Sequence, residues 1–292
     1  MEKGDENMKW MSFKQDGKEK YGFYEEEKQE VGIVSDMEGA PATLAAAIEE
    51  QEFLASISRD TKSVPYIKET SIEWLAPIPR PLKNVMCVGK NYRDHAIEMG
   101  GEVSVPEHPM IFTKAPTTVS AHKASIPAYE SLTDSLDYEG ELAVIIGKKG
   151  KEITREDALD YVFGYTVLND ITARDLQSRH KQFFIGKSLD GSCPMGPWIV
   201  SKDEVADPHN LAIQTTVNGE IRQQSDTSHF IFPIDEVIHV LSKGMTLEPG
   251  DIIATGTPAG VGFAMDPKGT LQKGDTVEIT VEGVGTLSNT VQ

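Results

Sequence analysis

The sequence has few of the features that mark secreted, membrane-spanning or disulfide-stabilised proteins. Only two cysteines, Cys87 and Cys193, occur in 292 residues, too few for a disulfide framework. No uninterrupted apolar run is longer than that of residues 142–146, far short of the roughly 20 residues that span a bilayer. Residues 1–9 carry both signs of charge and lead into no apolar segment. We therefore expect no signal peptide and a cytoplasmic location.

A basic surface is also missing. The chain has 28 Lys and Arg residues against 46 Asp and Glu residues, a net charge of −18, and the acids are spread along its length. Nucleic acids and anionic membranes both require a basic footprint, so we expect neither as a partner. A small anionic substrate would be repelled as well, unless a metal ion and local basic residues offset the charge at its site.

The pattern of short apolar segments predicts two domains. Residues 1–73 combine alternating segments with one helical stretch, residues 41–57, and suggest a small N-terminal α+β domain that ends before the Pro-rich residues 76–81. Beyond residue 83, irregularly spaced strands favour an α+β fold built on a mixed β-roll over residues 74–292. We expect its strands at residues 85–88, 110–114, 141–146, 164–169, 198–201, 212–217, 252–255 and 276–281, and its helices at 94–99, 155–158, 173–177 and 234–242.

Three acids stand where two of these strands begin or end. Glu139 and Glu141 are two residues apart at the start of an apolar strand, so their side chains point to the same face. Asp170 follows the apolar residues 164–169. A divalent cation would relieve the repulsion and the desolvation of such carboxylates, and an all-oxygen site suits Mg²⁺ or Mn²⁺. A solvated acidic edge strand explains the spacing equally well.

A short helix carries a candidate general base. Asp94 is placed to cap it, and His95 and Glu98 are three residues apart, close enough for the carboxylate to orient the imidazole. A histidine held in this way can take a proton from water near neutral pH. An ordinary surface helix with a local ion pair is the alternative.

Two further segments could bind an anion. Lys187 lies among apolar residues, where a lysine needs an anionic partner, and Arg174 follows Asp170 closely. We expect both to bind the substrate, together with Gln177 three residues beyond Arg174, although Arg174 could instead form a structural salt bridge. The glycine-rich residues 255–262 place Gly256 and Thr257 where backbone N–H groups and a hydroxyl can contact an anion, unless the segment is a plain turn.

Five of these segments together resemble the fumarylacetoacetate hydrolase family, especially its shorter members that act as acylpyruvate hydrolases or oxaloacetate decarboxylases. The blocks are residues 89–95, 137–141, 169–175, 186–188 and 250–258. The resemblance implies that Glu139, Glu141 and Asp170 are metal ligands and that Lys187 and the Thr257 loop face the substrate. It also implies that His95 and Glu98 form a dyad, that the fold is a mixed β-roll, and that the protein is a homodimer.

The resemblance leaves several reactions open on one small 2-oxo acid. We expect hydrolysis of the carbon–carbon bond of an acylpyruvate, because only that reaction needs a base that activates water. Decarboxylation of oxaloacetate and isomerisation through the same enolate are the alternatives. A protein that binds such metabolites without turnover is a further alternative from a different class.

Overall fold

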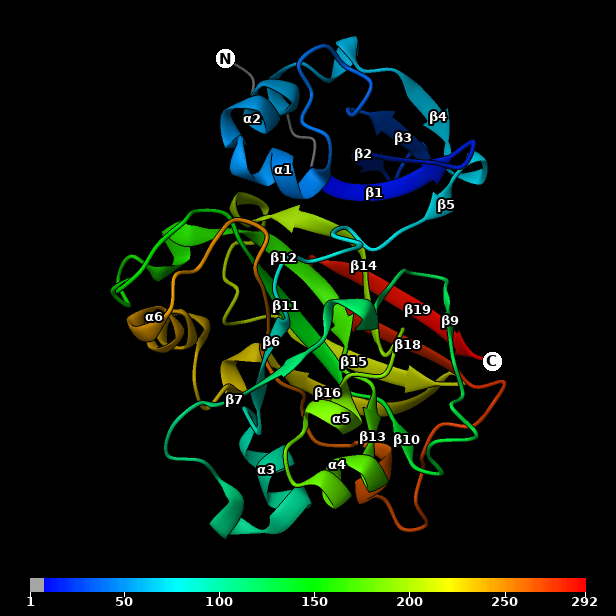
Figure 1. Ribbon diagram of the computed structural model, residues 1–292, viewed down its shortest axis with the longest axis vertical. Helices are drawn as coiled ribbons and strands as arrows, with labels where there is room; N and C mark the ends of the chain where they lie inside the picture. The colour runs from blue at the N-terminus through cyan, green and yellow to red at the C-terminus, as the bar shows by residue number, and fades with distance from the viewer. Residues whose placement is uncertain (1–7) are drawn as a thin grey trace.

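The computed structural model describes residues 8–292, and the chain forms a smaller and a larger part (Figure 1). Because residues 1–7 lie outside the described residues, the expectation about a signal peptide is not addressed. Among the described residues, no helix is long and apolar enough to cross a bilayer. The smaller part contains β1 (Lys9–Gln15), β2 (Lys18–Glu25), β3 (Glu30–Ile33), α1 (Leu44–Glu49), α2 (Gln51–Arg59), β4 (Tyr66–Lys68) and β5 (Glu73–Trp74).

One twelve-stranded mixed sheet runs through both parts. Its order is β4-β3-β2-β1-β14-β12-β11-β17-β6-β7, with β5 paired to β1 and β8 to β14. The pairing of β1 with β14 connects the two parts at Lys9 and Val200. The domain boundary near residue 73 stays a prediction. The remaining strands of this sheet are β6 (Val85–Gly89), β7 (Met110–Lys114), β8 (Val119–Ser120), β11 (Gly140–Ile146), β12 (Val162–Asn169), β14 (Cys193–Ser201) and β17 (Ile252–Ala254).

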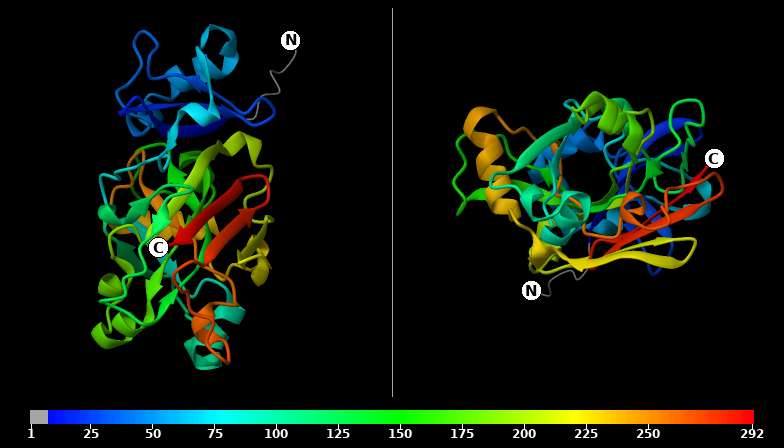
Figure 2. Two further views of the ribbon diagram at one scale, coloured as in Figure 1. Left: turned by 90° about the vertical axis from the view of Figure 1, so that its right-hand side faces the viewer. Right: turned by 90° about the horizontal axis from the view of Figure 1, so that it is seen from below.

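A second sheet of five strands packs against β11 and β12. Leu142 and Val167 on the first sheet share a buried core with Ile213 and Ile279 on the second. Viewed from below, the strands of the larger part curl around a common axis, which confirms the expected α+β fold with a mixed β-roll (Figure 2). The second sheet consists of β16 (Glu220–Asp226), β15 (Ala212–Val217), β18 (Thr276–Val281), β19 (Gly285–Val291) and β9 (Ser125–Ile126), and β10 (Leu136–Asp137) pairs separately with β13 (Thr172–Ala173).

Helices α3 (Arg93–Gly100), α4 (Arg174–His180) and α5 (Phe184–Lys187) lie together at the lower end of Figure 1, whereas α6 (Ile234–Gly244) lies at the side. The expected helices at residues 94–99, 173–177 and 234–242 are confirmed, and α5 was not predicted.

Two helix predictions need correction. The stretch 41–57 is divided into α1 and α2, because Glu50 has φ −100° and ψ 58°, outside the helical region. The helix expected at residues 155–158 is a turn that leads into a 3-10 helix, Ala158–Tyr161. Here the Thr154 hydroxyl donates to the Asp157 carboxylate at 2.9 Å and accepts from the Asp157 N–H at 3.2 Å. Such local bonds compete with helix formation.

Candidate active site

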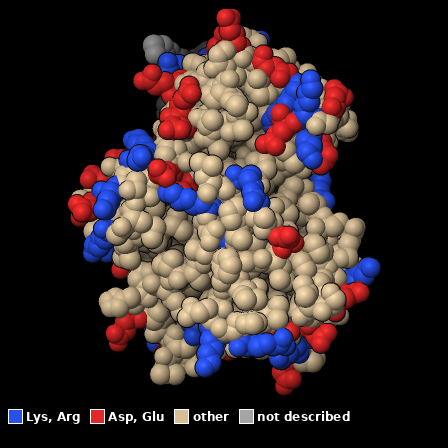
Figure 3. Space-filling view, viewed as in Figure 1, with Lys and Arg blue, Asp and Glu red and all other residues tan. Residues whose placement is uncertain are grey.

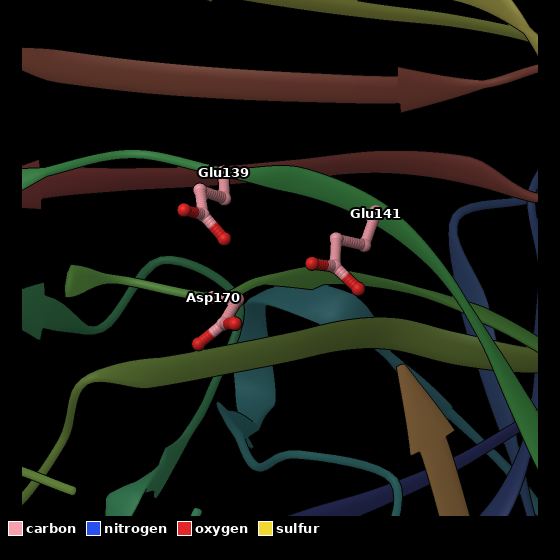
Figure 4. A group of neighbouring side chains, drawn as sticks. All are labelled: Glu139, Glu141 and Asp170. Carbon is pink, nitrogen blue, oxygen red and sulfur yellow. The ribbon is translucent and has the colours of Figure 1, made fainter. Parts of the chain in front are cut away.

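The register of β11 and β12 brings the three predicted carboxylates together. The two strands are antiparallel, and Gly140 lies opposite Asn169. Glu139, which precedes Gly140, and Asp170, which follows Asn169, are therefore neighbours. The Asp170 N–H donates to the Glu139 carbonyl at 2.9 Å. Oxygen atoms of Glu139, Glu141 and Asp170 lie within 4.8 Å of one another, and the side chains converge (Figure 4).

These carboxylates are buried. Glu139 is 5% exposed, Glu141 is 2% exposed and Asp170 is 0% exposed. The alternative of a solvated acidic edge strand is therefore wrong, since β11 and β12 are interior strands of the sheet. Buried carboxylates at this distance from each other need opposite charges nearby, and three cations supply part of that charge.

Two lysines contact the cluster directly. Lys187 Nζ lies 2.7 Å from Glu139 Oε2 and 2.6 Å from Asp170 Oδ2. Lys114 Nζ lies 2.9 Å from Asp170 Oδ1, and both lysines are buried. The sequence analysis missed Lys114, whose only signal was its position as the last residue of a predicted strand. Lys187 was expected to face the substrate, and the structure shows it bound to the carboxylates while it also lines the cavity.

Arg174 is likewise held by acids. Its Nη2 lies 2.8 Å from Asp137 Oδ2 and 2.7 Å from Glu139 Oε1, and its Nη1 donates to Gln177 Oε1 at 3.3 Å. The structural salt bridge considered as an alternative is therefore present. Asp137, which the sequence analysis did not select, also accepts the N–H groups of Gly262 and Phe263 at 2.8 and 3.1 Å.

The charges of this buried cluster do not balance. Four carboxylates, those of Asp137, Glu139, Glu141 and Asp170, surround three cations, so the formal sum is −4 plus 3, or −1. For Glu139, burial acts to raise the pKa, but Lys187 and Arg174 outweigh it and hold the pKa below its ordinary value. Burial raises the pKa of Glu141 well above the ordinary value, and Asp170 and Glu139 raise it further.

Glu141 differs from the other two carboxylates because no ion pair with a described cation stabilises it. Its Oε2 accepts the Gly256 N–H at 2.7 Å. The expected contact of Gly256 with substrate stays a prediction, and the structure shows its N–H engaged with Glu141. Only glycine fits there, because the residue has φ +104° and a Cβ atom would lie 2.7 Å from the Asn91 Cβ.

The donor set fits a divalent cation. Three buried carboxylates converge on one point, all donors are oxygen atoms, and a divalent cation would offset the residual negative charge of the cluster. Oxygen-only sites of this kind suit Mg²⁺ or Mn²⁺ better than Zn²⁺, which favours histidine and cysteine. Glu139, Glu141 and Asp170 would hold the ion.

The His95 dyad forms as expected. His95 Nδ1 lies 2.7 Å from Glu98 Oε1, and His95 is 5% exposed. Glu98 Oε2 also accepts the Gly260 N–H at 3.0 Å, so the dyad is anchored to the glycine-rich segment. The surface-helix alternative therefore does not describe His95. The expectation that Asp94 caps α3 is wrong, because the N-cap is Tyr92 and Asp94 lies in the first turn.

A cavity of about 280 Å³ joins the dyad to the carboxylates. Glu98, Asp170 and Gly256 support the cavity without lining it. Thr257 lines it, but its hydroxyl is engaged, since it donates to the Gly140 carbonyl at 2.9 Å and accepts from Gln223 at 2.7 Å. Seven of the ten predicted site residues line the cavity: His95, Glu139, Glu141, Arg174, Gln177, Lys187 and Thr257.

Comparison with known proteins agrees with this geometry. Residues 84–292 match the family described as fumarylacetoacetate (FAA) hydrolase C-terminal. The chain belongs to the fumarylacetoacetate hydrolase family. The match contains all ten predicted site residues, the whole five-stranded sheet, and the seven strands of the larger sheet that follow residue 84.

Three similar proteins are informative. Oxaloacetate tautomerase YisK of Bacillus subtilis is 61% identical over 216 residues, which cover 74% of this chain and 72% of the relative. The structure of a fumarylacetoacetate hydrolase from Exiguobacterium antarcticum has a TM-score of 0.85 and 43% identity, and covers 98% of this chain and 99% of that one. Maleylpyruvate hydrolase from Sphingobium sp. SYK-6, in complex with manganese (II) ion and pyruvate, has a TM-score of 0.79 and 29% identity, and covers 97% of this chain and 98% of that one.

Proposed function

We propose that this protein interconverts the enol and keto forms of oxaloacetate, with Mg²⁺ or Mn²⁺ held by Glu139, Glu141 and Asp170. The observation that carries the proposal is the shared cavity. The imidazole of His95, oriented by Glu98, lines the same space as Glu139 and Glu141. A group that can move a proton therefore faces the cation site across one small cavity. The 61% identity to an oxaloacetate tautomerase supports this substrate.

Binding of a 2-oxo acid would use the charges at the base of the cavity. Glu139, Glu141 and Asp170 would hold a divalent cation, which would supply Lewis-acid stabilisation of negative charge on the 2-oxo oxygen of the substrate. Arg174 and Gln177 line the cavity beside this point and would orient the substrate carboxylate. The buried Lys187 keeps Glu139 and Asp170 in position and adds positive charge near the substrate.

Tautomerisation then requires only the movement of protons. The enol loses the proton of its C2 hydroxyl, C3 gains one proton, and the C2–C3 double bond becomes a C2–O double bond. His95 would deliver the proton to C3 and would be restored by the proton released from the hydroxyl. Glu98 holds the imidazole through Nδ1, which leaves Nε2 to exchange the proton.

Hydrolysis of an acylpyruvate is the second candidate, and it is the reaction expected from the sequence. The dyad supports it as well, because His95 could take a proton from water that attacks the distal carbonyl. The carbon–carbon bond would break to give a carboxylic acid and pyruvate. The similarity to maleylpyruvate hydrolase favours keeping this candidate.

Substrate profiling separates these reactions. The Mn²⁺-loaded protein would be mixed with enol-oxaloacetate, acetylpyruvate and fumarylpyruvate, while enol absorbance and pyruvate are measured in parallel. Fast loss of the oxaloacetate enol without pyruvate supports the tautomerase. Pyruvate formed from oxaloacetate would identify a decarboxylase, and pyruvate formed from an acylpyruvate would identify a hydrolase. If no substrate is converted faster than in protein-free buffer, all three activities are rejected.

We also propose a homodimer, following the family resemblance. Sedimentation velocity of the Mn²⁺-loaded protein tests it, and a mass near the 32.0 kDa of one chain would contradict it.

A further inference from the structure

Four cations line the cavity, and they fall into two pairs. Arg174 and Lys187 are buried at its base and are engaged with carboxylates. The ammonium groups of Lys90 and Lys181 have no ion pair or hydrogen bond to any residue within 8–292, and these two residues are half-buried and exposed, respectively. The chain has a net charge of −18, yet these two cations at one cavity are paired with none of its described acids. We infer that their partner is an anionic ligand.

The backbone at both lysines is unusual. Lys90 has φ +55° and Lys181 has φ +59°, in the left-handed region that side chains other than glycine rarely adopt. Lys90 follows β6 directly, and Lys181 follows α4. Strained residues of this kind gather at ligand clamps because the surrounding structure imposes their conformation. Of the eight described non-glycine residues with positive φ, these two are the ones that line the cavity.

The two lysines reach the cavity from different elements of the fold. Arg174 begins α4 and Lys181 follows its last residue, so their Cα atoms are about 10 Å apart along the helix axis, at 1.5 Å per residue. Lys90 Nζ lies 3.9 Å from the position of a Cβ atom on Gly100, at the end of the helix that carries His95. Lys and Arg side chains also gather at the lower end of the face in Figure 3, the end where α3 and α4 lie in Figure 1.

Part of the cavity wall is apolar. Met99, Met110, Phe112 and Phe183 line it, and the rings of Phe112 and Phe183 meet edge to face at 5.4 Å. Such a wall gives no hydrogen bonds to a polar ligand along its length. It is suited to a short carbon chain with a charged group at each end, because the charges would meet cations at the base and at the mouth.

We propose that Lys90 and Lys181 form a second anionic subsite, which binds the distal carboxylate and selects dicarboxylic over monocarboxylic 2-oxo acids. The inference rests on the proposed function, in which the 2-oxo carboxylate end lies at the base of the cavity. For oxaloacetate, the C4 carboxylate then lies toward the mouth. Both lysines act in binding, and neither takes part in the proton transfer assigned to His95.

A matched pair of ligands tests the subsite. Oxaloacetate and 2-oxobutyrate differ only in a carboxylate that replaces a methyl group. Titration calorimetry would measure both affinities for the Mn²⁺-loaded protein in a His95→Gln background, where turnover is slow, and enol loss would give KM and kcat in the otherwise unchanged protein. We expect Lys90→Met and Lys181→Met each to lower the preference for oxaloacetate about three- to tenfold, through weaker oxaloacetate binding alone.

Two controls complete the test. Lys181→Arg should restore most of the preference, and Lys151→Met, at an exposed lysine that does not line the cavity, should leave it unchanged. An unchanged preference in both Met variants, or an equal loss of affinity for both acids, would overturn the subsite while leaving the proposed function intact. If the unsubstituted protein binds neither acid, both proposals fail.

Discussion

The base of the cavity and the His95 dyad are built in different ways. The carboxylates lie at or just beyond the paired ends of two interior strands of the large sheet, and each of their buried cations bonds to at least one acid. The dyad comes from α3, a helix of eight residues outside both sheets, and one bond from Glu98 to the Gly260 N–H ties it to the glycine-rich segment. We therefore expect the first region to contribute to folding as well as to the proposed chemistry, and the second mainly to the proposed chemistry. Substitutions in the two regions should therefore affect stability and rate differently.

The largest combined effect is expected from Glu139→Ala. If Glu139 were only a metal ligand, as the family resemblance implies, this variant would lose activity and keep its fold. The structure changes that expectation, because Glu139 pairs with both Lys187 and Arg174, and its removal leaves two buried cations short of negative charge. We expect complete loss of activity and a fall of about 3 kcal/mol in the free energy of unfolding, measured by urea denaturation without metal. Unchanged stability would show that the base of the cavity is not structural.

Glu141→Gln separates metal binding from folding. Glu141 accepts a hydrogen bond from Gly256, which the glutamine oxygen can still accept, and it has no cationic partner among the described residues to leave unpaired. We expect activity to be lost while metal-free stability changes little. In thermal denaturation, Mn²⁺ at 100 times its Kd should stabilise the unsubstituted protein by about 2.7 kcal/mol and this variant far less. Equal stabilisation of both proteins would exclude Glu141 as a ligand.

His95→Gln tests the other region alone. The imidazole is placed to transfer a proton, so its loss should lower kcat about 10²- to 10⁴-fold. Stabilisation by Mn²⁺ should stay at the value of the unsubstituted protein, because His95 is not among the three residues proposed to bind the ion. If Mn²⁺ no longer stabilises this variant, the two regions are not separable as proposed.

The pH dependence of metal affinity should report the base of the cavity. Burial and the neighbouring Asp170 and Glu139 raise the pKa of Glu141, so in the metal-free protein a proton occupies this carboxylate to a higher pH than usual. Metal binding must release that proton, and affinity should weaken as pH falls, by up to about tenfold per pH unit. Calorimetric titration with Mn²⁺ from pH 5 to pH 8 measures this, and an affinity independent of pH over that range would contradict it.

The sequence predicted the carboxylates because their geometry is local. Strand alternation relates Glu139 to Glu141, and the apolar strand that ends at Asp170 made this acid a candidate before the family resemblance assigned the three residues a common role. Two of their neighbours were not predictable in this way. Lys114 pairs with Asp170, and Asp137 pairs with Arg174, and both contacts depend on the three-dimensional fold. The division of residues 41–57 into two helices was missed for a related reason, because nothing in the local apolar spacing marks Glu50 as the break.

Glu98→Gln should give the smallest effect, because it preserves most of the local structure. Glutamine can still accept the Gly260 N–H that now bonds to Glu98 Oε2, but it lacks the negative charge that stabilises a protonated His95. We expect kcat to fall about tenfold, equivalent to about 1.4 kcal/mol, with KM and Mn²⁺ stabilisation unchanged. Glu98→Ala also removes the bond to Gly260, so it should lower kcat further. If the Gln and Ala variants lose the same activity, the hydrogen bond between Glu98 and Gly260 contributes nothing to the rate. Glu98 would then act on His95 through its negative charge alone.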